Sequence, residues 1–169
     1  EETLAEMMED GLILDAVTAQ SEQQRSDMWA RREAASEVIF DRRPFVNTDI
    51  AVALPDVQTF LTEARKRLLA LDPGADDLSV VHLGDGNVHY TAYPSKEDPE
   101  LSAAIREMVD DVVQDLGGSF SAEHGVGLSK LDSMAKRKDP VALDVMRAIK
   151  DALDPSGILN PGKVIPPKR

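Results

Sequence analysis

Two histidines stand on either side of a short turn in the sequence "VVHLGDGNVHY", residues 80–90. The chain has three histidines, and the third, His124, directly follows Glu123 in "SAEHGVG". The residues Gly-Asp-Gly-Asn between the pair are typical of a β-hairpin loop, because glycine and asparagine tolerate positive φ angles. In such a hairpin we predict that His82 pairs directly with His89, with the two Cβ atoms about 5 Å apart on one face.

Two imidazoles at this separation can share one metal ion, and Glu123 would add a carboxylate ligand. Two histidines and one carboxylate, with other positions open, are a usual ligand set for catalytic zinc or another divalent ion. His124 would then be an unligated base nearby. The alternative is a structural histidine pair with Glu123 solvated and His124 on the surface. The residue types leave both interpretations open, because nothing in the sequence forces residues 82 and 123 together.

The charge balance excludes some partners. Lys and Arg number 19 and Asp and Glu number 31, which gives a net charge of −12. Such a surface repels nucleic-acid backbones and anionic lipid, so we expect neither as a partner. No apolar run is long enough to cross a bilayer. The absence of cysteine excludes disulfides and thiolate metal sites, and a cytoplasmic location is the expectation.

The length of 169 residues suits one domain with a proper core. We therefore expect residues 1–169 to form a single domain, with no internal repeat or linker. The acidic start "EETLAEMMEDG" has no initiator Met and no signal-peptide pattern, so we expect the chain to be a fragment of a larger polypeptide.

The elements that must position the histidines follow from apolar spacing and turn residues. Ser21 and Gln24 have the form of a capping box at the start of one helix, and Ser95 or Asp98 could cap another. The expected strands are 12–19, 45–54, 78–83 and 88–93, with a further short one near 119; the expected helices are 21–40, 55–71, about 99–116 and 139–153. This order predicts an α+β protein, a ferredoxin-like sandwich whose mainly antiparallel sheet carries helices on one face.

Four stretches together make a family resemblance specific. "HLGDGNVHY", "SAEHGVGLSK" and "DPSGILNPGKV" occur in this order, and "DAVTAQSEQQRSDMWARRE" precedes them. The chain resembles, over nearly its whole length, the C-terminal region of FAD-linked oxidases, a family that includes D-lactate dehydrogenases, glycolate oxidases and D-2-hydroxyglutarate dehydrogenases. The resemblance implies a substrate domain whose FAD is held mainly by an N-terminal domain outside this sequence.

The resemblance also implies roles for individual residues. His82, His89 and Glu123 match the family's metal ligands, with zinc the first expectation and manganese or iron the alternatives. His124 matches the active-site base, and Arg32 matches the arginine that binds the substrate carboxylate. The implied reaction is oxidation of a 2-hydroxy acid to a 2-oxo acid by hydride transfer to FAD.

Further positions are implied to touch substrate or cofactor. Ser36 falls where some relatives place a substrate-contacting threonine, and Asn160 is expected to approach the flavin. Asn47 stands where the D-2-hydroxyglutarate enzymes have lysine, and Thr91 stands where they have asparagine. Because Asn47 cannot form an ion pair with a second carboxylate, a D-lactate-type or glycolate-type substrate is favoured.

Two other classes of function stay open at this level. One is a self-contained metallohydrolase that uses His82, His89 and Glu123 and needs no flavin. The other is a non-catalytic binding or oligomerisation module with a purely structural histidine pair. The electron acceptor of an oxidase is not readable from these residues. Without a flavin domain we expect the chain to be inactive as a dehydrogenase and to pair as a homodimer through surface which that domain would cover.

Overall fold

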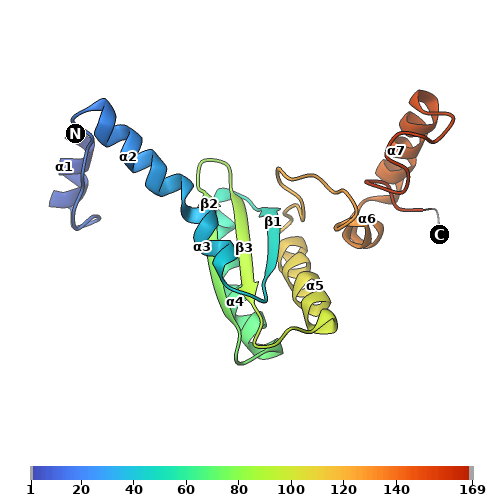
Figure 1. Cartoon of the computed structure of the whole chain (residues 1–169), viewed down its shortest axis with the longest axis horizontal. Coiled ribbons are helices and arrows are strands. Elements are labelled where there is room, and N and C mark those ends of the chain that lie inside the picture. Colours follow the sequence, from blue (N-terminus) through green and yellow to red (C-terminus); the bar gives the residue numbers. More distant parts are fainter. Residues whose placement is uncertain (1, 168–169) are drawn as a thin grey trace. The chain divides into compact units, whose positions relative to one another are not determined.

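The computed structural model describes residues 2–167, apart from the side chain of Ser36 (Figure 1). The chain forms two compact units, Glu1–Asp41 and Arg42–Arg169, and each is described by itself. The assignment of the whole chain to one domain stays a prediction.

The first unit contains three helices: α1 (Glu2–Glu9), α2 (Glu22–Glu33) and α3 (Ala35–Asp41). The predicted cap of α2 is present, because the backbone N–H of Gln24 donates to Ser21 Oγ at 3.2 Å. The predicted single helix is interrupted at Ala34, whose ψ is −8°, and Glu37 N–H donates to Ala34 O only three residues back. This tighter turn separates α2 from α3.

The expected strand at residues 12–19 is wrong, because this segment is irregular in the structure. Its residues have the composition of a strand, but Leu12, Leu14 and Val17 are all exposed. A strand is stabilised by a hydrogen-bonded neighbour and by burial of one face, and this segment has no strand partner among the described residues.

The second unit is built on a three-stranded antiparallel sheet in the order β1-β3-β2. The strands are β1 (Val46–Ala51), β2 (Asp76–His82) and β3 (Asn87–Tyr93). The short helix η1 (Leu54–Asp56) and α4 (Val57–Leu71) connect β1 to β2, and α5 (Pro99–Asp115) follows β3. Ser119 then forms a single antiparallel bridge with Ala51 on the free edge of β1, where a ferredoxin-like sandwich has its fourth strand. The predicted α+β fold is confirmed.

One face of this sheet packs against α4 and α5 and forms the core. Alternate strand residues point into it, and Tyr90 of β3 meets Phe60 of α4 edge to face with ring centroids 5.8 Å apart. The principal core side chains are Val46, Ile50, Val88, Tyr90 and Ala92 from the strands, Phe60, Ala64 and Leu68 from α4, and Ile105, Val109 and Val112 from α5. Asp98 is the predicted cap that α5 uses, accepting from the N–H groups of Glu100 and Leu101.

The predicted register of the hairpin is wrong by two residues. His82 pairs with Asn87, and His89 pairs with Val80, so the turn is made by residues 83–86. Gly86 explains the shift: its φ is +76°, its carbonyl accepts from Val52 N–H, and a Cβ there would collide with the Val52 carbonyl oxygen. Because strand side chains alternate with period two, a shift of two residues still leaves both histidines on one face.

The last part of the chain carries two more helices, α6 (Leu131–Arg137) and α7 (Pro140–Leu153), before an irregular tail. The side chain of Arg137 attaches α6 to α5 through Glu107 and Asp111 at 2.8 and 2.6 Å. Among residues 2–167, no helix is long and apolar enough to cross a membrane.

Candidate metal and substrate site

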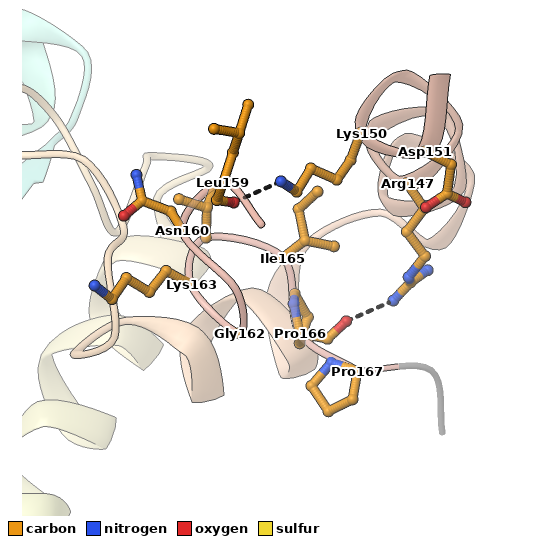
Figure 2. Close-up of a pocket in the computed structure, with 11 residues that line it drawn as sticks. Arg147, Lys150, Asp151, Leu159, Asn160, Gly162, Lys163, Ile165, Pro166 and Pro167 are labelled. Atoms are coloured by element: carbon orange, nitrogen blue, oxygen red, sulfur yellow. Dashed lines mark hydrogen bonds between the residues drawn. The ribbon is translucent and has the colours of Figure 1, made fainter. Parts of the chain in front are cut away.

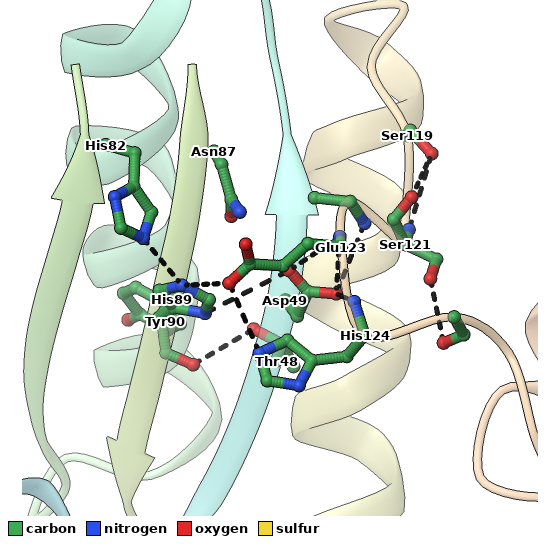
Figure 3. A network of polar contacts seen from close by, with 12 residues as sticks. Thr48, Asp49, His82, Asn87, His89, Tyr90, Ser119, Ser121, Glu123 and His124 are labelled. Carbon is green, nitrogen blue, oxygen red and sulfur yellow. Dashed lines mark hydrogen bonds and ion pairs between the residues drawn. The ribbon is translucent and has the colours of Figure 1, made fainter. Parts of the chain in front are cut away.

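The three histidines gather on the sheet face opposite α4 and α5 (Figure 3). His89 of β3 alternates with the core residues Val88 and Tyr90, and Asp49 of β1 stands next to the core residue Ile50. These alternations follow from strand geometry, which sends neighbouring side chains to opposite faces. One face of the sheet therefore carries the core, and the other carries Asp49, His82 and His89.

Two of the predicted ligands, His82 and Glu123, each lie close to the third, His89. His82 Nε2 lies 3.2 Å from His89 Nε2, and His89 Nε2 lies 3.0 Å from Glu123 Oε1. With metal–ligand bonds of about 2.0 Å in a tetrahedral zinc site, neighbouring ligand atoms are about 3.3 Å apart. The two observed spacings therefore match those between neighbouring ligands of a divalent ion. His82 and Glu123 each lie beside His89, but among the described residues the group whose ligand atoms all lie within 4.8 Å of one another is Asp49, His89, Glu123 and His124, without His82.

His124 lies at the outer side of this group. Its Nε2 is 3.4 Å from Glu123 Oε1, its ring stands edge-on to that of His89 at 5.4 Å, and its side chain is 63% exposed. One ligand atom each from Asp49, His89, Glu123 and His124 lies within 4.8 Å of the others. His124 is thus close enough to be either a base beside the predicted ligands or a ligand itself, and its assigned role stays a prediction.

Asp49 is the principal residue of the site that the sequence analysis missed. It is 5% exposed, and its Oδ2 accepts from the backbone N–H groups of Ala122, Glu123 and His124 at 3.3, 3.2 and 2.9 Å. Lys130 Nζ donates to the same oxygen at 3.1 Å. Burial raises the pKa of this carboxyl, but the His124 amide and the Lys130 ammonium outweigh that effect, so the pKa lies below its ordinary value.

The loop that carries Glu123 is also tied internally. Lys130 Nζ donates to Ser121 Oγ at 2.9 Å, and Ser121 Oγ donates to the Gly125 carbonyl at 2.9 Å.

The signal that could have identified Asp49 is a charged residue inside a strand that is otherwise suited to burial, in "TDIAVA". Such a residue is buried only when it has partners, and the sequence does not identify those partners.

Asn47 and Thr91 form a directly opposed pair between β1 and β3. They lie two residues along from the opposed pair Asp49 and His89, on the same face of the sheet, which is about 7 Å along the strands. Thr91 is fully buried, and its hydroxyl has no hydrogen-bond partner among the described residues. The predicted substrate contacts at 47 and 91 are therefore neighbours of the histidine group, and their contact with substrate stays a prediction.

Asn87 adds an unassigned polar group near the histidines. It is the cross-strand partner of His82, it is buried, and its side-chain oxygen has no hydrogen-bond partner among the described residues. A buried acceptor without a partner is costly unless a ligand or water satisfies it. The site thus has unused hydrogen-bonding capacity beside His82.

Arg32 and Ser36 belong to the first unit. Arg32 lies on α2, where its guanidinium is about half exposed and pairs with Glu33 at 3.1 Å. Ser36 lies within α3, and its side chain is outside the described part of the structure. The structure does not place these two residues relative to the histidines, so their predicted roles in binding substrate stay predictions.

Asn160 lies in a different part of the second unit, in a pocket of about 600 Å³ between α7 and the tail (Figure 2). Its backbone is left-handed, with φ +46°, and Lys163 lines the same pocket. Arg147 Nη2 donates to the Pro166 carbonyl at 3.2 Å, which holds the tail against α7. The predicted approach of Asn160 to a flavin is compatible with this position and stays a prediction.

A comparison with protein families identifies one match. The model described as FAD linked oxidases, C-terminal domain, matches residues 1–164.

Curated relatives are similar over the same length. A D-2-hydroxyglutarate dehydrogenase of Stutzerimonas stutzeri (strain A1501) is 37% identical over 167 residues, which cover 96% of this chain and 36% of that protein. A probable mitochondrial D-2-hydroxyglutarate dehydrogenase of Oryza sativa subsp. indica is 36% identical over 163 residues, covering 96% and 29%. A mitochondrial D-2-hydroxyglutarate dehydrogenase of Arabidopsis thaliana is 34% identical, with coverages of 96% and 29%. The chain thus spans about a third of the length of the curated relatives it matches.

Proposed function

Because the chain belongs to the FAD-linked oxidases and matches their C-terminal domain, we propose that it is the metal- and substrate-binding part of an FAD-dependent 2-hydroxy-acid dehydrogenase. The observation that supports this proposal is that His89 Nε2 lies 3.2 Å from His82 Nε2 and 3.0 Å from Glu123 Oε1, which are spacings that neighbouring ligands of a divalent ion have. The flavin is assigned mainly to a further domain of the complete enzyme, with Asn160 of this chain approaching it.

In this proposal the metal, when bound, supplies Lewis-acid polarisation, and the flavin supplies the oxidising capacity. The protein's own residues bind the hydroxy acid and move its proton. His124 accepts the hydroxyl proton, which requires a neutral imidazole, and its ring lies beside Glu123 in a solvent-exposed position from which the proton can leave. Arg32 binds the carboxylate as a bidentate partner; this role rests on the resemblance alone.

The proposed substrate carries a single carboxylate, as lactate or glycolate does. The relatives are named for D-2-hydroxyglutarate, which has two carboxylates. Asn47 is uncharged and lies on the site face opposite Thr91, so it offers no ion pair to a second carboxylate. This preference is tested by titrating the zinc-loaded chain with glycolate, D-lactate and D-2-hydroxyglutarate.

We expect Asn47→Lys to increase affinity for D-2-hydroxyglutarate about tenfold and to leave glycolate affinity nearly unchanged, because a partly buried charged hydrogen bond contributes about 1.5 kcal/mol. Stronger binding of D-2-hydroxyglutarate than of the monocarboxylates by the unaltered chain would show that the proposed substrate is wrong.

The metal assignment is tested by elemental analysis of the purified chain after incubation with zinc or manganese. We expect one divalent ion per chain, lost in His82→Ala, His89→Ala and Glu123→Ala. His124→Ala is the matched control: it removes a neighbouring imidazole that the proposal assigns to proton transfer, so the ion should be retained. Loss of the ion in His124→Ala but not in His82→Ala would replace the proposed ligand set by the group that includes Asp49 and His124.

A further inference from the structure

We propose that Asp49 is a positioning residue: its carboxylate fixes the loop 121–124 so that Glu123 and His124 face His89. This inference rests on the proposed function, since it concerns how the same site is assembled. Its evidence is a separate set of contacts, those of the Asp49 carboxylate with the loop backbone and with Lys130. None of the residue roles implied by the family resemblance involves Asp49 or Lys130.

Several hydrogen-bond donors of the loop converge on one carboxylate oxygen of Asp49. Three consecutive backbone N–H groups, those of residues 122, 123 and 124, all point at Asp49 Oδ2. Consecutive amides converge on one point only when the backbone curls around it, as in anion-binding nests. The loop therefore takes its shape from the carboxylate, and that shape sets where the side chains of Glu123 and His124 begin (Figure 3).

The hydrogen bonds of Asp49 connect the sheet to the loop. Asp49 lies in the middle of β1, 73 to 75 residues before the amides that it binds. Its cross-strand partner in β3 is His89, whose Nε2 lies 3.0 Å from Glu123 Oε1. A single side chain thus connects the strand pair carrying one predicted ligand to the loop carrying another.

Asp49 also influences the imidazole of His89. Asp49 Oδ1 lies 3.9 Å from His89 Nδ1, which is too long for a hydrogen bond but close enough for electrostatic attraction. The carboxylate favours the tautomer with the proton on Nδ1, which leaves Nε2 with a lone pair directed at His82 and Glu123. The same carboxylate therefore orders the loop and prepares the nitrogen that a metal needs.

The side chain at position 49 has to be charged, because its partner Lys130 is charged. Lys130 is largely buried, and its ammonium bonds both Asp49 Oδ2 and Ser121 Oγ. An asparagine at position 49 would keep the size of the side chain but would leave this ammonium without its counter-ion and would present one acceptor oxygen of lower charge to the amides. The arrangement therefore requires an aspartate and not merely a polar residue.

The experiment compares Asp49→Asn and Lys130→Met with Asp154→Asn as a matched control. Asp154 is another buried aspartate that binds a lysine and two backbone amides, but it lies on the tail side of α7. The whole chain is used, and circular dichroism checks that each variant is folded. Zinc affinity is measured by competition with a chelator, and hydrogen exchange of the amides at 122–124 is measured in metal-free chain.

We expect Asp49→Asn to speed exchange at these three amides and to weaken zinc binding about 10- to 100-fold, the usual effect of removing a residue that orients metal ligands. Lys130→Met should act in the same direction more weakly, and Lys130→Arg should restore most of the affinity. Asp154→Asn should change neither quantity. If Asp49→Asn does not fold, the two Lys130 variants decide the question through the same measurements.

A folded Asp49→Asn, or a folded Lys130→Met where Asp49→Asn does not fold, with unchanged exchange and unchanged zinc affinity would overturn the proposal and leave the metal assignment intact. If instead the unaltered chain binds no zinc, the metal assignment fails. In that case faster exchange at 122–124 in Asp49→Asn alone still supports the positioning role, and its absence overturns it. The two proposals therefore fail separately.

Discussion

Asp49 and Asp154 each bury a carboxylate among backbone amides and a lysine. Asp49 Oδ2 binds three amides of the loop 122–124 and Lys130, and Asp154 binds the amides of Ile158 and Leu159 together with Lys150. Both residues are almost completely buried, at 5% and 7% exposed. In both the pKa is below its ordinary value; at Asp154 the Lys150 ammonium is the main cause.

The difference is the distance along the chain over which the two aspartates act. Asp154 binds groups four and five residues away and ends α7, so it shapes a local turn. Asp49 binds groups 73 to 81 residues away, so its contacts exist only when the sheet has formed. The same chemical motif therefore acts as a helix end in one region and as a tertiary connection beside the histidines in the other. A charge cluster of this type has to be interpreted from its partners and not from its composition.

The largest effect is expected from Asp49→Ala. Removing the carboxylate leaves the largely buried Lys130 ammonium without its counter-ion and three backbone N–H groups without their acceptor, which should lower the free energy of unfolding by about 3 kcal/mol. Urea denaturation followed by circular dichroism measures this difference. A loss below about 0.5 kcal/mol, the size usual for an unimportant surface site, would show that the cluster does not stabilise the second unit.

Asp154→Ala should destabilise the chain less than Asp49→Ala. Its partners lie within five residues of it at the end of α7, so its removal loosens one local turn and does not detach a loop from the sheet. We expect faster hydrogen exchange at Ile158 and Leu159 and unchanged exchange at 122–124. Changes at both loops in this variant would mean that the two regions are not independent, and the comparison would no longer hold.

A smaller effect is expected from Ser121→Ala. The hydroxyl accepts from Lys130 and donates to the Gly125 carbonyl, so its loss removes two hydrogen bonds from the partly exposed loop. We expect the free energy of unfolding to fall by about 1 kcal/mol, with the Asp49 contacts retained. Exchange at the His124 amide separates the two cases: unchanged protection shows that Asp49 holds the loop by itself, and lost protection shows that Ser121 shares this task.

The smallest expected effect is the pH dependence that Asp154 contributes. Its pKa in the folded chain lies below the ordinary value of 3.8, so the stabilisation is present above that pH and is lost as the pH falls through the lower, folded-state pKa. Asp154→Asn should therefore show a shallower decrease of unfolding free energy on acidification below pH 3.8 than the unaltered chain. Urea titrations between neutral and strongly acidic pH test this; equal slopes for the two proteins would contradict it.

Much of the fold was predictable because it depends on local patterns. The apolar spacing of α4 and α5, the cap at Asp98 and the alternation in β1 and β3 each appear within a few neighbouring residues. The predicted hairpin register was wrong because close backbone contact at Gly86 with Val52 of another segment decides where the turn begins. The strand expected at 12–19 was wrong because composition does not supply a neighbouring strand.

The sequence by itself determined that His82, His89 and Glu123 have the side chains of a metal site and that both hairpin histidines share one face. That conclusion survived the change of register because strand side chains alternate with period two. Only the tertiary structure decided that Glu123 and His124 reach His89, and that Asp49 and Lys130 hold them there. The physical reason is that a buried carboxylate is stable only with its partners, and these partners are brought to it by the sheet from more than 70 residues away.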